Sequence, residues 1–152
     1  MPTAHTTPFI IELDSSQALD PAIVGGKTAS VADLIRQGTT VPYGFAIPAN
    51  AFDEFIEPVK GVVAKLLTAV DPDNPASAFE AADAIATLLN SLPTPIGLAD
   101  AIATRINGTA ITTTAFAVRS SATVEDLEAA SFAGMYDTFL DATNAEKLVR
   151  RI

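Results

Sequence analysis

The chain has 152 residues, of which 49% are hydrophobic, and its 18 acidic and 9 basic residues give a net charge of −9. This length and composition predict one globular domain with a hydrophobic core. The negative charge argues against nonspecific binding to nucleic acid, because nucleic-acid phosphates attract a basic surface. The chain contains no cysteine, which excludes disulfides and thiolate metal sites.

No segment reaches the roughly 18 consecutive apolar residues that a membrane-spanning helix needs, so we expect no membrane contact. Residues 1–9 (MPTAHTTPF) lack the basic and apolar segments of a signal peptide, and we expect a cytoplasmic protein. His5 is the only histidine. We interpret it as a solvated residue, because one histidine cannot build a metal site.

The first expected elements are a short strand and a helix. Residues 9–13 (FIIEL) are an apolar run with the length of a strand. Further along, Thr28 or Ser30 can cap a helix, and Gly38 is a typical C-terminal stop for it.

A pair of glycines precedes this helix and makes its start a candidate phosphate site. Gly25 and Gly26 let the backbone turn where a side chain would clash. Lys27 then places a positive charge beside the backbone N–H groups and the positive end of the helix dipole. The alternative is a solvated lysine at a helix start. A P-loop is excluded, because its motif requires a glycine at the position of Pro21.

The middle of the chain reads as scaffold. Residues 41–48 (VPYGFAIP) predict an edge or bulged strand, interrupted by proline and glycine. The spacing of apolar residues then predicts four helices, near residues 50–57, 62–70, 77–89 and 94–107. We expect Asn50 to cap the first of these, a capping box of Ser77 and Glu80 to begin the third, and Thr94–Pro95 to begin the fourth. These helices carry no convergent set of polar side chains.

A second candidate phosphate site follows the next strand. Residues 110–118 (AITTTAFAV) are rich in β-branched residues and predict a strand that carries Arg119 at its end. Ser120 and Ser121 come directly after it. A guanidinium beside hydroxyls and a glycine loop can bind phosphate oxygens through several hydrogen bonds at once.

An acidic segment and a small-residue loop lie between this site and a returning strand. Residues 123–130 form either a solvated turn or a segment in which Asp126 pairs with Arg119 and orients it. Residues 131–134 (SFAG) are small and typical of a loop, and residues 135–140 predict the returning strand.

Two separated groups of motifs occur in this order along the chain. The upstream group comprises residues 24–30 (VGGKTAS), 38, 41–42 and 44–45. The downstream group comprises residues 118–123 (VRSSAT), 125–126 (ED), 131–134 (SFAG) and 137–138 (DT). Together they resemble the nucleotide-binding domain of the phosphoenolpyruvate synthase and pyruvate phosphate dikinase family, which rifampicin phosphotransferases share.

The resemblance implies an α/β (α+β) fold in which helices flank a small mixed sheet. Residues 1–152 would be the amino-terminal part of an ATP-grasp-type ATP-binding domain. In the family, this domain binds ATP and passes phosphate to a histidine on a separate domain. That histidine phosphorylates pyruvate, as in a pyruvate, water dikinase, or an antibiotic. By position, Lys27 and Arg119 would contact the nucleotide phosphates, and Arg119 would be the catalytic residue that stabilises the transferred group.

The same resemblance implies further residues of the pocket. The backbone at Gly134 and the hydroxyl of Thr138 would line it, and Ser120 and Ser121 would fix the loop. Asp137 matches the motif, but we assign it no metal. The ligands of Mg²⁺ and the acceptor domains come from later in the family chain. We therefore expect the rest of the enzyme as a partner, and incomplete catalysis by this chain alone.

Three functions stay open at this point. The first is the ATP-binding portion of a phosphoenolpyruvate synthase or dikinase. The second is a fragment of a rifampicin-type antibiotic phosphotransferase, since the segment does not reveal the acceptor. The third is a noncatalytic interaction module that keeps the fold and docks on a partner. Intact site residues argue against the third function, and the short length of the chain argues for it.

Overall fold

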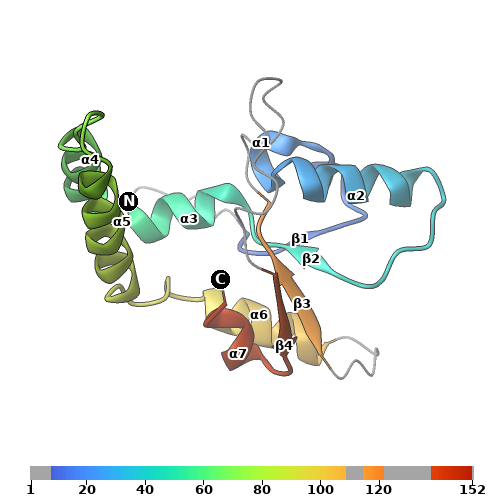
Figure 1. Cartoon of the computed structure of the whole chain (residues 1–152). Helices are drawn as coiled ribbons and strands as arrows, with labels where there is room; N and C mark the ends of the chain where they lie inside the picture. The colour runs from blue at the N-terminus through green and yellow to red at the C-terminus, as the bar shows by residue number, and fades with distance from the viewer. Residues whose placement is uncertain (1–7, 109–114, 122–137, 152) are drawn as a thin grey trace, which may run out of the picture. The chain divides into compact units, whose positions relative to one another are not determined.

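The computed structural model describes residues 8–108, 115–121 and 138–151 (Figure 1). The chain divides into two compact units. The first unit consists of Met1–Ala51 and Ile96–Ile152, and the second consists of Phe52–Pro95. The strands and both segments predicted to bind phosphate belong to the first unit, whereas the second unit is built from helices.

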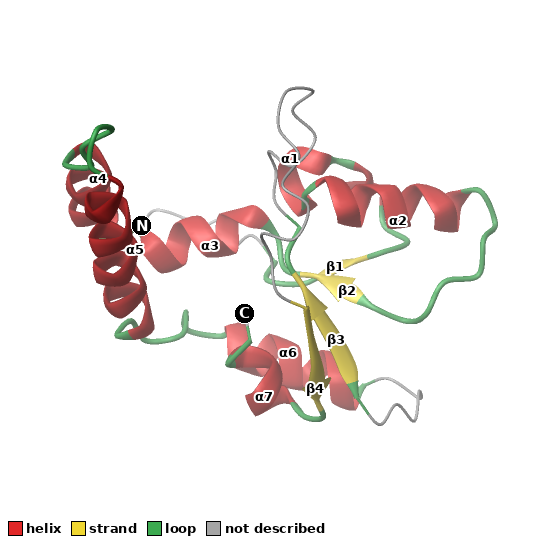
Figure 2. Ribbon diagram, viewed as in Figure 1, coloured by secondary structure: helices red, strands yellow, loops and turns green. Residues whose placement is uncertain are grey.

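Among the described residues, the strands form two short antiparallel pairs (Figure 2). The pairs are β1 (Ile11–Glu12) with β2 (Phe45–Ala46), and β3 (Phe116–Arg119) with β4 (Thr138–Ala142). The predicted combination of helices with a small sheet is thus present. In the described part of the chain, however, the strands do not join in the one mixed sheet that the sequence led us to expect.

Both strands of the first pair are shorter than predicted, for local reasons. Leu13 to Ser15 turn away directly after β1, and the N–H of Ser15 donates to the carbonyl of Glu12 at 3.0 Å. Pro42 and Pro48 flank β2 and lack the N–H groups that a longer ladder would need. The first pair therefore has only two residues in each strand.

Three helices follow β1 in quick succession. They are the 3₁₀ helix η1 (Ser16–Leu19), α1 (Pro21–Val24) and α2 (Gly26–Arg36). The prediction that Thr28 or Ser30 caps α2 is wrong, because both residues lie inside the helix. The chain turns at Gly25, with φ 79°, and the helix begins at the next residue. The predicted stop is confirmed, since Gly38 adopts φ 85° directly beyond the helix end.

The other helices of the first unit are α6 (Leu98–Asn107) and α7 (Ala145–Val149). The predicted start of α6 at Thr94–Pro95 is wrong, because Gly97 adopts the left-handed conformation, φ 90°, and the helix begins only after it. The predicted end at residues 107–108 is confirmed. α7 packs against α6 and β4 (Figure 1).

The first unit contains two hydrophobic clusters. One packs α1 and α2 against the β1–β2 pair, and its buried residues are Ile11, Ala18, Val24, Ala32 and Ala46. The other joins α6 and α7 to β3 and β4 and has as its buried members Leu98, Ile102, Ala142 and Leu148. The β1–β2 pair contacts both clusters, because Ala46 belongs to the first and the adjacent Phe45 packs on the second. This shared ladder holds α2 and β3 in one unit.

The second unit contains most of α3 (Ala49–Ile56) together with α4 (Lys60–Thr68) and α5 (Pro75–Asn90). Asn50 lies inside α3 and does not cap it, since the carbonyl of Pro48 already accepts from the N–H of Ala51 at 2.9 Å. The predicted capping box at Ser77 is also wrong. Asn74 caps α5 instead, accepting from Ala76 N–H at 3.2 Å, because the proline after it suits the first helical position.

Candidate functional site

The two segments predicted to bind phosphate meet in the structure. The backbone N–H of Thr28 donates a hydrogen bond of 3.0 Å to Oγ of Ser121, across 93 residues of sequence. Thr28 is the third residue of α2, and Ser121 lies two residues beyond the end of β3. The start of the helix that carries Lys27 therefore lies against the segment that carries Arg119.

Close packing of Gly25 against Ser121 strengthens this contact. A Cβ atom at Gly25 would lie 1.9 Å from the carbonyl oxygen of Ser121 and 2.4 Å from its Oγ, far inside any van der Waals distance. The backbone of Gly25, at φ 79° and ψ 159°, is also open almost only to glycine. Two independent reasons thus require glycine at the point where the segments touch.

Arg119 and Thr138 are direct partners at the end of the β3–β4 ladder. Residues directly opposite each other in an antiparallel pair project from the same face and have Cβ atoms roughly 5 Å apart. Both residues are exposed. The register of these two consecutive strands thus places two of the predicted site residues opposite each other.

The remaining predicted residues differ in how far the structure describes them. Lys27 is the second residue of α2 and is exposed, as is Ser120. Gly134 lies outside the described residues, and so do Asp126 and Asp137. The predicted backbone contact at Gly134 and the alternative pairing of Asp126 therefore stay predictions.

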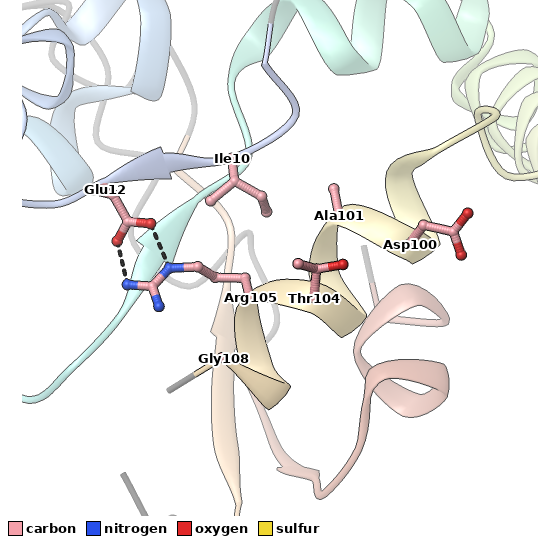
Figure 3. A pocket seen from close by; sticks show the side chains of 7 residues that line it. All are labelled: Ile10, Glu12, Asp100, Ala101, Thr104, Arg105 and Gly108. Carbon is pink, nitrogen blue, oxygen red and sulfur yellow. Dashed lines mark hydrogen bonds and ion pairs between the residues drawn. The ribbon is translucent and has the colours of Figure 1, made fainter. Parts of the chain in front are cut away.

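Sequence reasoning missed an ion pair between Arg105 of α6 and Glu12 of β1 (Figure 3). Nε of Arg105 donates to one carboxylate oxygen of Glu12, and Nη2 donates to the other at 2.6 Å. The guanidinium also lies 4.7 Å from the centroid of the Tyr43 ring. The pKa of Arg105 is raised above its ordinary value, chiefly because Glu12 accepts its hydrogen bonds. The sequence contained one signal of this pair, because Glu12 is a single acidic residue inside the apolar run 9–13.

A wide-open depression of about 480 Å³ lies between β1 and α6, beside this ion pair (Figure 3). The residues that line it are Ile10, Glu12, Asp100, Ala101, Thr104, Arg105 and Gly108. None of these is a residue predicted to bind phosphate. The charges of Glu12 and Arg105 satisfy each other here, and we interpret the pair as a structural link between β1 and α6.

The described residues lack two further features. No group of three or more histidine, cysteine, aspartate or glutamate side chains lies close enough together to hold a metal ion. No helix in the described ranges combines the length and apolar character that crossing a membrane requires.

Residues 21–152 match the protein family described as pyruvate phosphate dikinase, AMP/ATP-binding domain. The chain belongs to this family. The match includes the Gly25–Thr28 segment and the Arg119–Ser121 segment, so the contact between them lies within the region that defines the AMP/ATP-binding domain.

Several curated proteins are similar to this AMP/ATP-binding domain over nearly its whole length. A rifampicin phosphotransferase from Streptomyces sviceus is 35% identical over 150 residues, which cover 97% of this chain and 17% of that protein. A probable phosphoenolpyruvate synthase from Staphylothermus marinus is 35% identical over 150 residues, which cover 93% of this chain and 18% of that protein. The prodigiosin synthesizing transferase PigC from Serratia marcescens is 35% identical over 144 residues, which cover 95% of this chain and 15% of that protein. The chain thus spans less than a fifth of the length of these relatives.

The predicted site residues in the described ranges suit an anion. They are one ammonium, one guanidinium and three hydroxyls, supplied by Lys27, Arg119, Ser120, Ser121 and Thr138. Such groups donate hydrogen bonds to phosphate oxygens, and two of them carry positive charge. None carries a carboxylate, which is the side chain that Mg²⁺ prefers. The set therefore fits the phosphates of an AMP/ATP-binding domain and does not fit a metal ion.

Proposed function

We propose that this chain is the amino-terminal part, residues 1–152, of an ATP-grasp-type ATP-binding domain, and that the contact between α2 and the end of β3 marks the phosphate end of its nucleotide site. The observation that carries the proposal is the hydrogen bond from Thr28 N–H to Ser121 Oγ. It holds two cation-bearing segments together, and the family to which the chain belongs is named for AMP/ATP binding.

Each cation has a distinct task in this proposal. Lys27, near the positive end of the α2 dipole, would neutralise phosphate charge as a point cation. Arg119, at the end of β3, would bind phosphate oxygens through its planar fork and act as the catalytic residue that stabilises the transferred group. Arginine suits this task because its charge is permanent and its donors are fixed in one plane.

The hydroxyl groups and the glycine loop complete the proposed pocket. Thr138, opposite Arg119 in the ladder, would donate from the same face of the sheet. Ser120 would contribute a second donor and help to fix the segment, and the backbone at Gly134 would approach the phosphates closely. Since Ser120 and Thr138 are exposed, their hydroxyls are accessible to a ligand.

We do not assign a role to Mg²⁺ in this chain. ATP is ordinarily bound with this ion, and phosphoryl transfer needs a metal clamp. Among the residues that the structure describes, no acidic cluster could hold it. We propose that the metal ligands lie in the rest of the enzyme, which would then be the natural partner of this chain.

For the whole protein, we propose phosphoryl transfer from ATP through a phosphohistidine to pyruvate, as in phosphoenolpyruvate synthase. A rifampicin-type acceptor is the alternative. Relatives that are equally similar to this chain carry the names rifampicin phosphotransferase, phosphoenolpyruvate synthase and prodigiosin synthesizing transferase. Because the names differ while the matched region is the same, the residues that select the acceptor are expected outside this region.

A noncatalytic interaction module is a second candidate function, and one observation favours it. The second unit exposes several large apolar side chains, namely Phe52 at 55%, Leu67 at 59% and Phe79 at 74%. Adding the rest of a related enzyme to this chain separates the candidates. Restored ATP turnover supports the phosphotransferase, whereas binding without turnover supports the module.

Calorimetric titration of the chain with ATP, ADP, AMP and tripolyphosphate tests the phosphate site directly. We expect the affinity to rise with the number of phosphates. We also expect tripolyphosphate, which lacks the nucleoside, to compete with ATP. Lys27→Ala is expected to remove most of this dependence. Lys65→Ala is the matched control, because Lys65 is an exposed helical lysine in the second unit. Equal affinities for ATP and AMP in the unmodified chain would contradict the proposal.

A further inference from the structure

The amino terminus of α2 is capped from a distant part of the chain. The first amide groups of a helix have no acceptor within the helix, and the N-cap side chain usually accepts one of them. Asp20 does so for α1, and Asn144 does so for α7. At α2 the N-cap residue is Gly25, which has no side chain, and Ser121 supplies the oxygen to the amide of Thr28.

Gly25 and Ser121 are complementary in this arrangement. A conventional capping side chain at Gly25 would begin with a Cβ atom 2.4 Å from Oγ of Ser121. The serine can reach the helix only because position 25 is glycine. Ser121 lies 93 residues beyond Thr28 in the sequence, and it thus takes the place of a local capping side chain.

We propose that Ser121 is a positioning residue that holds Lys27 and Arg119 at a fixed separation before the nucleotide arrives. This inference rests on the proposed ATP site. Lys27 immediately precedes Thr28, and Arg119 lies two residues before Ser121, so the hydrogen bond links the backbone beside Lys27 to a side chain close to Arg119. In this role Ser121 acts on the start of α2, through the hydrogen bond that its Oγ accepts from Thr28.

The physical gain is preorganisation. Two cations near one another repel, and without a constraint the segments that carry them would have to be ordered at the moment of binding. An interaction that fixes them beforehand reduces this cost and raises the affinity. Losing an N-cap typically changes stability enough to shift an equilibrium about fivefold to tenfold. We therefore expect a loss of ATP affinity of about that size when the Ser121 hydroxyl is removed.

The first test measures the cap itself, without nucleotide. Amide hydrogen exchange at Thr28 is slow in the unmodified chain if Ser121 accepts its proton, and Ser121→Ala is expected to accelerate it. Ser30→Ala is the control, because Ser30 lies on the same helix and donates only to the carbonyl of Gly26 among the bonds described. Unchanged exchange at Thr28 in Ser121→Ala would overturn the proposed cap.

The second test is a double-mutant cycle on ATP affinity, using Ser121→Ala, Lys27→Ala and the combined variant. If Ser121 works by placing Lys27, its loss weakens binding in the unmodified chain but has little further effect once Lys27 is gone. Additive losses would show that Ser121 supports the fold in general, and would overturn the positioning role.

Two isosteric variants keep the test decisive if Ser121→Ala folds poorly. Ser121→Thr and Ser121→Val have the same shape and differ in the hydroxyl, so their comparison isolates the hydrogen bond. We expect the threonine variant to bind ATP about fivefold more tightly than the valine variant, as for the loss of a cap. Equal affinities would contradict the inference.

Failure of this inference is distinguishable from failure of the proposed function. If neither Lys27→Ala nor Arg119→Ala changes ATP affinity, the proposed site is wrong and the positioning role falls with it. If both weaken binding while Ser121→Ala does not, the ATP site stands and only the role of Ser121 is overturned.

Discussion

Arg105 and Glu12 connect α6 to β1 through a two-point ion pair that spans 93 residues of sequence. Their side chains are 28% and 40% exposed, so water screens the pair in part. Bidentate geometry and the adjacent Tyr43 ring favour it above an ordinary surface pair. The pair holds the β1–β2 ladder, which contacts both hydrophobic clusters, against the helix that leads toward β3.

Replacing Arg105 with methionine is expected to lower the free energy of unfolding by about 1 kcal/mol, because the apolar stem is kept while the ion pair is lost. Urea denaturation measures this change. The unfolding free energy of Arg105→Lys should lie between those of the wild type and Arg105→Met, since lysine cannot bind both carboxylate oxygens in one plane. Arg150→Met is the control, because Arg150 forms an exposed pair with Glu146 within α7. A loss in Arg150→Met as large as that in Arg105→Met would contradict this account.

The contribution of Arg105 should not vary with pH in the neutral range. Its pKa is raised by Glu12, so the folded state binds the proton more tightly than the unfolded state does. The resulting stability is complete below the unfolded pKa and is lost only as the pH rises through the higher, folded pKa. Both values lie far above neutrality. The difference in unfolding free energy between the wild type and Arg105→Met should therefore be equal at about pH 6 and pH 9. A difference that falls across this range would show that another group carries the effect.

Gly25→Ala is expected to be the most disruptive glycine substitution among those that the structure describes. The new Cβ would overlap the backbone of Ser121, and the conformation at φ 79° and ψ 159° is strained for alanine. We expect a loss of at least about 2 kcal/mol in unfolding free energy, together with loss of ATP binding.

Gly61 and Gly38 provide matched controls for this substitution. Gly61 lies inside α4 with open space at its Cβ position, so alanine there should be neutral or slightly stabilising. Gly38 also has open space but adopts φ 85°, so alanine should cost roughly 1 kcal/mol from backbone strain alone. Comparable thermal unfolding of all three variants would contradict the close contact at Gly25.

Arg119→Ala is expected to weaken ATP binding at least tenfold while leaving the thermal unfolding temperature nearly unchanged, because an exposed residue at a strand end contributes little to the core. Arg119→Lys should restore only part of the affinity, since it keeps the charge without the fork. Arg36→Ala controls for net charge, because Arg36 lies on α2 but pairs with Asp33 near the far end of that helix. Unchanged ATP affinity in Arg119→Ala would remove this residue from the site.

The existence of most helices could be predicted from apolar spacing, whereas their starts could not. Asn74, Gly25 and Gly97 decide where α5, α2 and α6 begin. A sequence offers several polar residues near each start, and only the turn that the backbone adopts selects one of them. Thr28 and Ser77 were reasonable candidates from their residue types, but the chain had already entered the helix before each of them.

In the candidate site too, the sequence indicated individual residues but not the contacts between distant parts of the chain. Lys27 after two glycines and Arg119 at the end of a strand could be named as candidate phosphate ligands from their neighbours and from the family resemblance, and this role stays a prediction. The contact between Thr28 and Ser121 could not be predicted, because nothing local indicates which hydroxyl will meet a helix 93 residues away. For the same reason the ion pair of Glu12 with Arg105 was missed, although a carboxylate in an apolar strand does call for a partner.

Nitrogen-15 NMR of the chain during titration with ATP tests the central claim most directly. The claim is that the start of α2 and the end of β3 bind the same phosphates. It predicts that the backbone signals of Lys27 and Thr28 and the side-chain Nε–H of Arg119 shift together, with one dissociation constant. Shifts confined to the depression beside Arg105, or different constants for the two segments, would contradict it.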